Sequence, residues 1–248
     1  MNIIHIEQCP STNIYLKELN QERKLDEGSL VLTANQTNGR GQRTNTWESQ
    51  AGKNITCSLL LYPDFLPLDR FFLLSETISL AIKDTLDTYV DDIFIKWPND
   101  IYFQDKKICG ILIENELTDN RYSQSVVGIG LNVNQEIFMS DAPNPVSLKQ
   151  ITGEDFNLNN LVSEMLKNCL SWYEMLKLDQ TQLIEQSYSK ALYRGKGLYL
   201  YKDTSGVFRA SLEKVESNGY LHLRTEDGEL RSYAFKEVEF LIIDNLTI

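Results

Sequence analysis

The first half of the chain is a series of short apolar runs separated by polar residues, a pattern typical of β-strands. Runs that alternate, or that are wholly apolar over four to eight residues, are expected where a sheet is covered on one or both faces. The predicted strands span residues 3–6, 29–34, 55–62, 92–97, 101–103, 107–117 and 122–134. Only short turns separate the last four, which favours an antiparallel meander over repeated βαβ units.

A second periodicity, with apolar residues every three or four positions, marks the helices. It predicts helices over residues 11–21, 66–89, 158–178 and 180–193, and a short one at 146–151. Ser11-Thr12-Asn13 has the residue types that cap a helix N-terminus. Each helix presents a single apolar stripe, so we expect the helices to cover the sheet.

The pattern changes again at Gly195, where short strands separated by glycine-containing turns begin. They are predicted at residues 198–201, 208–215, 220–224, 231–235 and 239–243. Five strands in so short a segment predict a small SH3-like β-barrel. The predicted fold class is therefore α+β, with a mixed, largely antiparallel sheet covered by helices in residues 1–193 and a small β-domain in residues 194–248.

One connection does not fit a simple strand–turn–strand pattern. The segment from Asn35 to Asn54 is several times longer than an ordinary hairpin turn, and it contains Gly39, Arg40, Gly41, Arg43 and Trp47 among its residues. A generic loop of this length would be interpreted as the disordered tip of a hairpin. Glycine exposes backbone N–H groups and arginine offers a planar fork of donors, so we interpret this segment as a lid that closes over an anionic ligand.

Composition excludes several classes of protein. The net charge of −11 argues against nucleic acid as a principal partner, because phosphate contacts need a basic face. The four cysteines are far apart and only two histidines are present, which predicts buried reduced thiols and no zinc site. No secretion signal and no apolar run of membrane-spanning length is visible, so we expect a cytoplasmic protein without a membrane partner.

Against this acidic background, a few cations mark where an anion could bind. Lys96 ends an apolar strand and Lys107 begins one, and a lysine turned inward at either place needs an anionic partner. Each lysine taken singly also fits a solvated strand end. Gly110, Gly128 and Gly130 interrupt strands, as expected where a ligand or another backbone approaches closely. The chain has no Walker loop, no G-x-G-x-x-G and no Ser-His-Asp arrangement.

Five motifs together resemble the biotin–protein ligases. The resemblance lies in the lid sequence from Gly39 to Trp47, and in four shorter motifs: S-T-N from Ser11, K-W-P-N-D from Lys96, K-x-x-G-I-L-x-E from Lys107 and G-I-G-x-N from Gly128. The motifs occur in the family's order and cover residues 11–132. The resemblance implies a class II synthetase-like catalytic domain followed by a small β-domain. It also implies that the chain activates biotin with ATP to biotinoyl-5′-AMP and transfers biotin to a lysine of a biotin carboxyl carrier protein.

The resemblance also implies a role for each matching position. Lys107 and Arg40 would be catalytic, with Lys107 between the biotin carboxylate and the α-phosphate of ATP. The biotin side would be formed by Ser11, Thr12, Asn13, Gln36, Gly39, Arg40, Gly41, Gln42, Lys107, Gly110 and Gly128. The ATP side would be formed by Arg43, Trp47, Lys96, Asn99, Asp100 and Asn132. Mg²⁺ would bridge the phosphates, and no residue is assigned to bind it.

The chain departs from the family pattern at Gln42 and Asn45, where many members carry basic residues. Ser11 already belongs to the catalytic motif, so we expect a monofunctional ligase without a DNA-binding domain. We also expect a monomer or a weak homodimer. Two alternatives stay open: a lipoate or octanoyl ligase of related architecture, and a biotin-binding sensor without catalytic activity.

Overall fold

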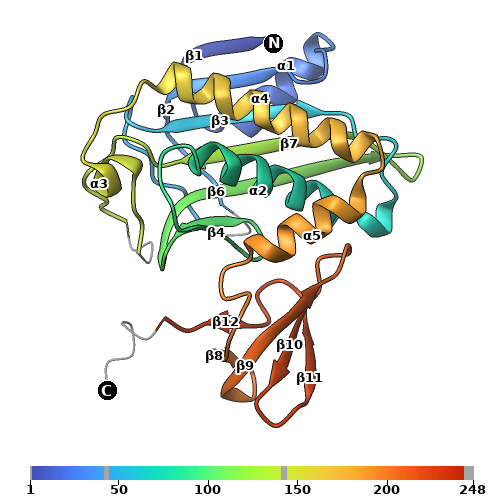
Figure 1. Ribbon diagram of the computed structural model, residues 1–248. Helices are drawn as coiled ribbons and strands as arrows, with labels where there is room; N and C mark the ends of the chain where they lie inside the picture. The colour runs from blue at the N-terminus through green and yellow to red at the C-terminus, as the bar shows by residue number, and fades with distance from the viewer. Residues whose placement is uncertain (1, 42–44, 141–143, 243–248) are drawn as a thin grey trace.

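A seven-stranded sheet forms the centre of the molecule, and a smaller five-stranded sheet lies below it in Figure 1. The computed structural model describes residues 2–41, 45–140 and 144–242. The large sheet has the strand order β1-β2-β3-β7-β6-β5-β4. Its strands are β1 (Ile3–Cys9), β2 (Leu30–Gln36), β3 (Ile55–Leu61), β4 (Ile93–Lys96), β5 (Asp100–Phe103), β6 (Lys106–Thr118) and β7 (Arg121–Leu131). Only β1 and β2 pair in parallel, so the predicted mixed, largely antiparallel sheet is confirmed.

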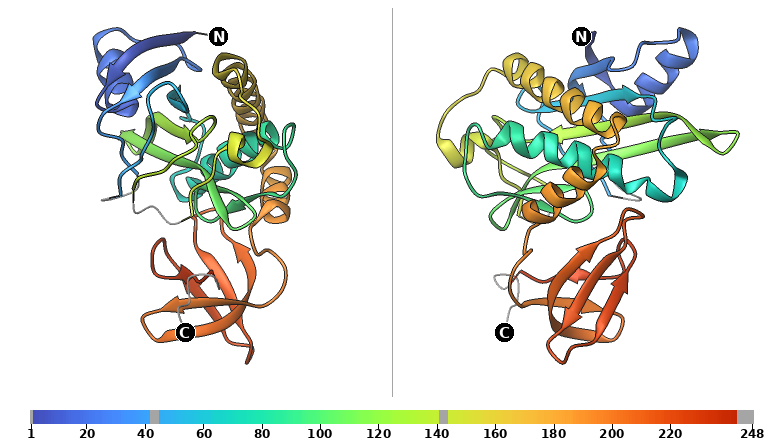
Figure 2. Two further views of the ribbon diagram at one scale, coloured as in Figure 1. Left: turned by 90° about the vertical axis from the view of Figure 1, so that its left-hand side faces the viewer. Right: turned by 45° about the vertical axis from the view of Figure 1, so that its right-hand side comes forward.

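Helices cover both faces of the large sheet. The helices are α1 (Thr12–Glu22), α2 (Phe72–Leu86), α3 (Leu148–Thr152), α4 (Leu158–Lys177) and α5 (Thr181–Ala191). Figure 2 shows α2, α4 and α5 layered on one side of the sheet, while α1 lies on the other. Alternation along β3 explains both contacts, because Leu59 and Leu61 enter the core beneath α2 and Leu60 packs with Leu16 of α1.

One predicted helix was too long. The apolar pattern of residues 66–89 predicted a single helix, but a 3₁₀ turn occupies Leu68–Arg70 and α2 begins at Phe72. Pro67 lacks an N–H and adopts extended backbone angles, so the helix does not extend back through it. Leu68 and Phe71 are exposed, which shows that they are not part of the core-facing stripe.

The small sheet contains the strands β8 (Tyr199–Asp203), β9 (Gly206–Val215), β10 (Leu221–Thr225), β11 (Leu230–Tyr233) and β12 (Glu239–Phe240). All its pairings are antiparallel, in the order β11-β10-β9-β8-β12, which is consistent with the small β-domain predicted from the sequence. The division into domains at residues 193 and 194 stays a prediction. Over the described residues, none of the helices combines the length and the apolar character that crossing a membrane requires.

The four cysteines are buried free thiols, as predicted from their spacing. They are Cys9, Cys57, Cys109 and Cys169, and burial raises the pKa of each thiol above its ordinary value. A thiol that stays protonated is a poor nucleophile and a poor metal ligand. The cysteines therefore contribute to packing.

A carboxyl group is buried between α2 and α5. Glu76 is 1% exposed, and its Oε2 has no hydrogen-bond partner among the described residues. The hydroxyl of Tyr188 on α5 is also buried and unpaired within that part of the chain. The pKa of Glu76 is raised to about 8, mainly by burial; the Glu185 carboxylate contributes to the rise and the Arg70 guanidinium opposes it. Glu76 is therefore protonated at neutral pH.

This raised pKa predicts a stability that falls as the pH rises from about 4 to about 8. The folded protein retains the Glu76 proton up to about pH 8, whereas an unfolded chain releases it near pH 4, so the contribution is complete below about pH 4 and is lost as the pH rises through 8. Between pH 6 and 8, we expect the unfolding free energy of Glu76→Gln to fall less steeply than that of the wild type, by about 1 kcal/mol per pH unit. Urea unfolding at several pH values measures the slope, with Glu18→Gln on the exposed face of α1 as control. Equal slopes in wild type and Glu76→Gln would contradict this assignment.

Candidate functional site

The face of the large sheet that carries α1 has a strip without side chains. Gly110, Gly128 and Gly130 lie on this strip, because they alternate with residues such as Ile111 and Ile129 whose side chains enter the core under α2. Gly110 and Gly130 are directly paired across β6 and β7. The glycines therefore form a flat floor on the opposite side of the sheet from the main core.

A cavity of about 1030 Å³ lies over this floor. Its volume is at the upper end of the range for small-molecule sites. Of the residues predicted from the sequence to form the site, those that line it are Ser11, Thr12, Asn13, Gln36, Arg40, Gly41, Trp47, Lys96, Asn99, Asp100, Lys107, Gly110, Gly128 and Asn132. The structure thus brings residues from the four shorter sequence motifs and from the lid together around one cavity.

One end of the cavity is neutral and rich in hydrogen-bonding groups. Gln36 Oε1 accepts a hydrogen bond from the backbone N–H of Thr12 at 2.9 Å and one from its hydroxyl at 3.2 Å. Ser58 Oγ lies 2.7 Å from Thr12 Oγ1 and 2.5 Å from Asn13 Oδ1. Ser11 precedes α1, yet its side chain makes no capping hydrogen bond. This end presents oriented amide and hydroxyl groups without a net charge.

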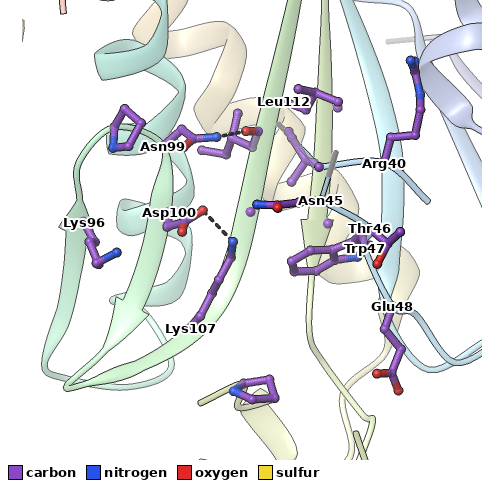
Figure 3. Close-up of a pocket in the computed structure, with 18 of the residues that line it drawn as sticks. Arg40, Asn45, Thr46, Trp47, Glu48, Lys96, Asn99, Asp100, Lys107 and Leu112 are labelled. Atoms are coloured by element: carbon purple, nitrogen blue, oxygen red, sulfur yellow. Dashed lines mark hydrogen bonds and ion pairs between the residues drawn. The ribbon is translucent and has the colours of Figure 1, made fainter. Parts of the chain in front are cut away.

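The other end of the cavity holds an ion pair. Lys107 Nζ lies 2.7 Å from Asp100 Oδ1, and a dashed line in Figure 3 marks this pair. The Lys107 side chain runs over Gly110, where an added Cβ would lie 3.4 Å from Nζ. Trp47 lies beside it, with its ring centroid 5.5 Å from the ammonium. Lys107 is therefore held at the floor of the cavity and is not a free strand terminus.

A second ammonium lies near this pair. Lys96 Nζ is 5.1 Å from the ring centroids of both Tyr102 and Phe240. Burial lowers the pKa of Lys96, and the nearby Asp100 carboxylate acts in the opposite direction. A cation between aromatic rings is attracted by their negative faces. Two ammonium groups and one carboxylate thus form an end of the cavity that suits a polyanion with its metal ion.

Side chains from the loops and from α1 occupy the space above two of the floor glycines. A Cβ at Gly130 would overlap the Trp47 indole, and a Cβ at Gly128 would lie 2.5 Å from Asn13 Oδ1. The sequence predicted close approach of a ligand or backbone at these glycines; the structure places Trp47 and Asn13 there. The Trp47 indole N–H is buried without a partner among the described residues. Trp47 and Asn13 therefore line the cavity together with Gly130 and Gly128.

The lid cation does not point at Lys107. Arg40 Nη2 donates to both carboxylate oxygens of Glu114 at 3.3 Å, and Figure 3 shows its side chain directed away from Lys107. Gly39 lies behind the lining, where its carbonyl accepts the backbone N–H of Trp47 at 2.9 Å. Gln42 and Arg43, also predicted for the site, lie outside the described residues.

Sequence reasoning missed two polar side chains behind the neutral end. Glu114 accepts a hydrogen bond from Asn13 Nδ2 at 2.7 Å and also binds Arg40, so it joins the lid to α1. Ser58 connects Thr12 and Asn13 from β3. A signal for Ser58 was present, since it is one of few polar residues in a fully buried strand, and Glu114 ends the K-x-x-G-I-L-x-E motif.

The cationic end also receives residues that no sequence motif indicated. Phe235, Lys236, Val238, Glu239 and Phe240, from the small sheet and the segment before β12, line the cavity. They follow Lys107 by more than a hundred residues, and neither apolar periodicity nor spacing connects them to it. Only the three-dimensional arrangement of the two sheets brings them together.

Comparison with known proteins places this site in a family. The family model described as "Biotin/lipoate A/B protein ligase family" matches residues 5–132, which include α1, the lid and the glycine floor. The chain belongs to the biotin/lipoate A/B protein ligase family. The bifunctional ligase/repressor BirA of Bacillus spizizenii is 31% identical over 217 residues, which cover 84% of this chain and 65% of the relative. The match thus spans just under two thirds of the length of this relative.

The fold of the family extends over nearly the whole chain. The biotin protein ligase from Aquifex aeolicus, solved in complex with biotin and ATP, aligns with a TM-score of 0.78 and 25% identity, covering 97% of this chain and 98% of that one. The biotin protein ligase from Leishmania major in complex with biotin aligns with a TM-score of 0.65 at 21% identity, which shows the shared fold. The match to the Aquifex protein covers the small sheet as well as the large one.

Proposed function

We propose that this chain is a biotin–protein ligase that activates biotin with ATP and then biotinylates a carrier-protein lysine. The observation that carries the proposal is the polarity of the cavity, in which a neutral hydrogen-bonding end and an ammonium–carboxylate end share one glycine floor. Biotin has the same polarity, with a neutral ureido ring at one end and a carboxylate at the other. The Aquifex relative was solved with both biotin and ATP bound.

Each end of the cavity has a role in this reaction. Thr12, Ser11 and Gln36 would hydrogen-bond the ureido group, whose N–H and C=O groups need paired acceptors and donors. The valeryl chain would run toward Gly110 along this face of the sheet, past Asn13 and Trp47, which cover Gly128 and Gly130. Lys107 would then bring the biotin carboxylate and the α-phosphate of ATP together, because a fixed cation offsets their mutual repulsion.

The chemistry proceeds in two steps. The biotin carboxylate oxygen attacks the α-phosphorus, pyrophosphate leaves, and the mixed anhydride biotinoyl-5′-AMP forms. A deprotonated lysine amine of the carrier then attacks the acyl carbon, and AMP leaves. Lys107 stabilises charge on the phosphoryl oxygens in the first step. The lid and Trp47 exclude water from the anhydride between the steps.

Mg²⁺ would arrive with ATP as part of the substrate. In the described part of the chain, no group of three or more His, Cys, Asp or Glu residues could hold a metal ion by itself. Mg²⁺ at nucleotide sites is held by one or two carboxylates, substrate phosphates and water. Asp100 lines the cavity beside Lys107 and fits that requirement.

A single reaction series tests the proposal against its alternatives. Purified protein is incubated with MgATP and either labelled biotin or lipoate, and acid-stable label on a biotin carrier domain and substrate-dependent ATP–pyrophosphate exchange are measured. A biotin ligase exchanges and transfers only with biotin. Exchange with lipoate alone would identify a lipoate ligase, and biotin binding without exchange would identify a sensor.

The proposed function gives Glu114 a measurable role. Glu114 holds both Asn13 and the lid residue Arg40 and is partly exposed, so we expect Glu114→Gln to raise the KM for biotin about two- to five-fold, the scale of one solvent-screened ion pair. Steady-state exchange rates at varied biotin concentration measure the change. Glu116→Gln is the matched control, because the Glu116 carboxylate also pairs with Lys17, at 3.7 Å, as Glu114 does at 3.9 Å. An equal KM in both variants would remove the proposed link between lid and ligand.

A further inference from the structure

One turn of the small sheet contacts the large sheet directly. The turn Glu216–Tyr220 joins β9 to β10, and its Gly219 carbonyl accepts the indole N–H of Trp97 at 3.0 Å. Its Ser217 carbonyl accepts the backbone N–H of Phe72, the first residue of α2, at 3.1 Å. Trp97 is 3% exposed, so this contact is made in the interior.

Gly219 is suited to this contact in two ways. Its φ of +86° lies in the left-handed region that favours glycine. An added Cβ would also lie 3.0 Å from Cδ2 and 3.3 Å from Cγ of the Phe72 ring. The turn itself is closed by a hydrogen bond of 2.7 Å from the Gly219 N–H to the Glu216 carbonyl. A side chain at position 219 would therefore push the turn away from α2 and Trp97.

Trp97 belongs to the segment that carries the charged end of the cavity. It lies between Lys96, the last residue of β4, and Asp100, the first residue of β5, and both of these side chains line the cavity. The segment is held from other sides as well. Ser75 Oγ of α2 donates to the Pro98 carbonyl at 3.3 Å, and Asn99 hydrogen-bonds the backbone of Ile111.

The small sheet contacts this segment in addition to α2 and β6. The Phe235 ring packs edge-on against Trp97 at a centroid distance of 6.1 Å, and Phe235 itself lines the cavity. Asp100 is the ion-pair partner of Lys107, so a shift of Trp97 moves a charge that lies 2.7 Å from the proposed catalytic ammonium. Misplacement of about 1 Å at such a group costs catalysis on the order of 10²-fold.

We propose that the Glu216–Tyr220 turn is a positioning element for the adenylation step, in which the Gly219 carbonyl fixes Trp97 and thereby the placement of Lys96 and Asp100. This inference rests on the proposed function. It assigns the small sheet a part in nucleotide activation. Transfer of biotin from preformed adenylate does not use the polyphosphate end of the cavity, so that step depends little on this turn.

A glycine pair in the same sheet provides the test. Gly219 and Gly228 both lie at turns with positive φ, +86° and +91°, but a Cβ at Gly228 meets no atom within 4 Å. Gly219→Ala and Gly228→Ala therefore bring the same backbone strain, and only the first disturbs the docked turn. We expect Gly219→Ala to raise the KM for ATP in biotin-dependent pyrophosphate exchange about ten-fold or more, and Gly228→Ala to leave it within two-fold.

A tryptophan pair tests the hydrogen bond alone. Trp97→Phe removes the donor to Gly219 and keeps an aromatic ring, so we expect the KM for ATP to rise about five-fold. Trp172→Phe is the control, because its indole N–H donates to Asp84 at 2.7 Å between α4 and α2, away from the cavity. Transfer from supplied biotinoyl-5′-AMP to the carrier should stay within two-fold of wild type in all four variants. If Gly219→Ala does not fold, the KM for ATP of Trp97→Phe alone tests the positioning role.

The outcomes separate this inference from the proposed function. A wild-type KM for ATP in both Gly219→Ala and Trp97→Phe would overturn the positioning role. Equal losses in exchange and in transfer would also overturn it, since they would indicate general structural support. Wild-type protein without biotin-dependent exchange would overturn the proposed function itself, and the inference with it.

Discussion

Lys107→Ala is expected to reduce biotin-dependent ATP–pyrophosphate exchange by about 10²-fold or more, the scale of losing one group that stabilises developing charge. Lys107 is held by Asp100 at 2.7 Å and lies over Gly110, so its ammonium has a defined position at the cavity floor. Removing it also leaves the Asp100 carboxylate unpaired where phosphates must bind. The lost attraction between Lys107 and the phosphates and the added repulsion from Asp100 both reduce the exchange rate.

Controls distinguish this effect from a change in fold. Lys106→Ala removes a neighbouring exposed lysine of the same strand and should exchange at the wild-type rate. Lys107→Arg keeps the charge but changes the geometry of its donors, so we expect intermediate activity. Near-normal exchange by a folded Lys107→Ala protein would show that Lys107 has no catalytic role.

Gly128→Ala is expected to weaken biotin binding about 5- to 150-fold, which corresponds to roughly 1–3 kcal/mol of overpacking. The new Cβ would lie 2.5 Å from Oδ1 and 3.1 Å from Cγ of Asn13. Asn13 has little freedom to move, because Ser58 and Glu114 hold its side chain from two sides. The strain therefore reaches the hydrogen-bonding end of the cavity directly.

The two substrates provide an internal control for Gly128→Ala. Gly128 lies at the neutral end, so the KM for biotin should rise while the KM for ATP stays close to wild type. Isothermal titration with biotin alone measures the same loss without catalysis. An equal rise in both KM values would indicate that the whole cavity had collapsed, and an unchanged biotin affinity would show that Asn13 can adjust.

Local patterns predicted most of the large sheet because its strands alternate between two environments. The runs around β3 and β6 were predicted to within one residue at each end, whereas the run predicted for β7 continued three residues past Leu131. The helix near Pro67 was overextended because its apolar residues continue past the point where the backbone can be helical. Periodicity records which residues are apolar and carries less information about where a helix begins.

Interactions between distant segments explain what the sequence did not predict. The motifs identified Lys96, Asp100 and Lys107 as site residues, and the structure brings all three to one end of a cavity. The contact of Trp97 with Gly219 joins segments more than a hundred residues apart. Such a contact has no local signal, because it depends on how the two sheets are packed.

The glycine floor has a consequence for how this cavity could come to accept a new ligand. Along β6 and β7, one set of alternate residues packs in the core and the other set faces the cavity. A one-residue slip in their pairing would exchange bare backbone for isoleucine and expose the interior to water. A new ligand therefore has to be accommodated within this register, through substitutions at single floor glycines, in α1 or in the loops around the rim.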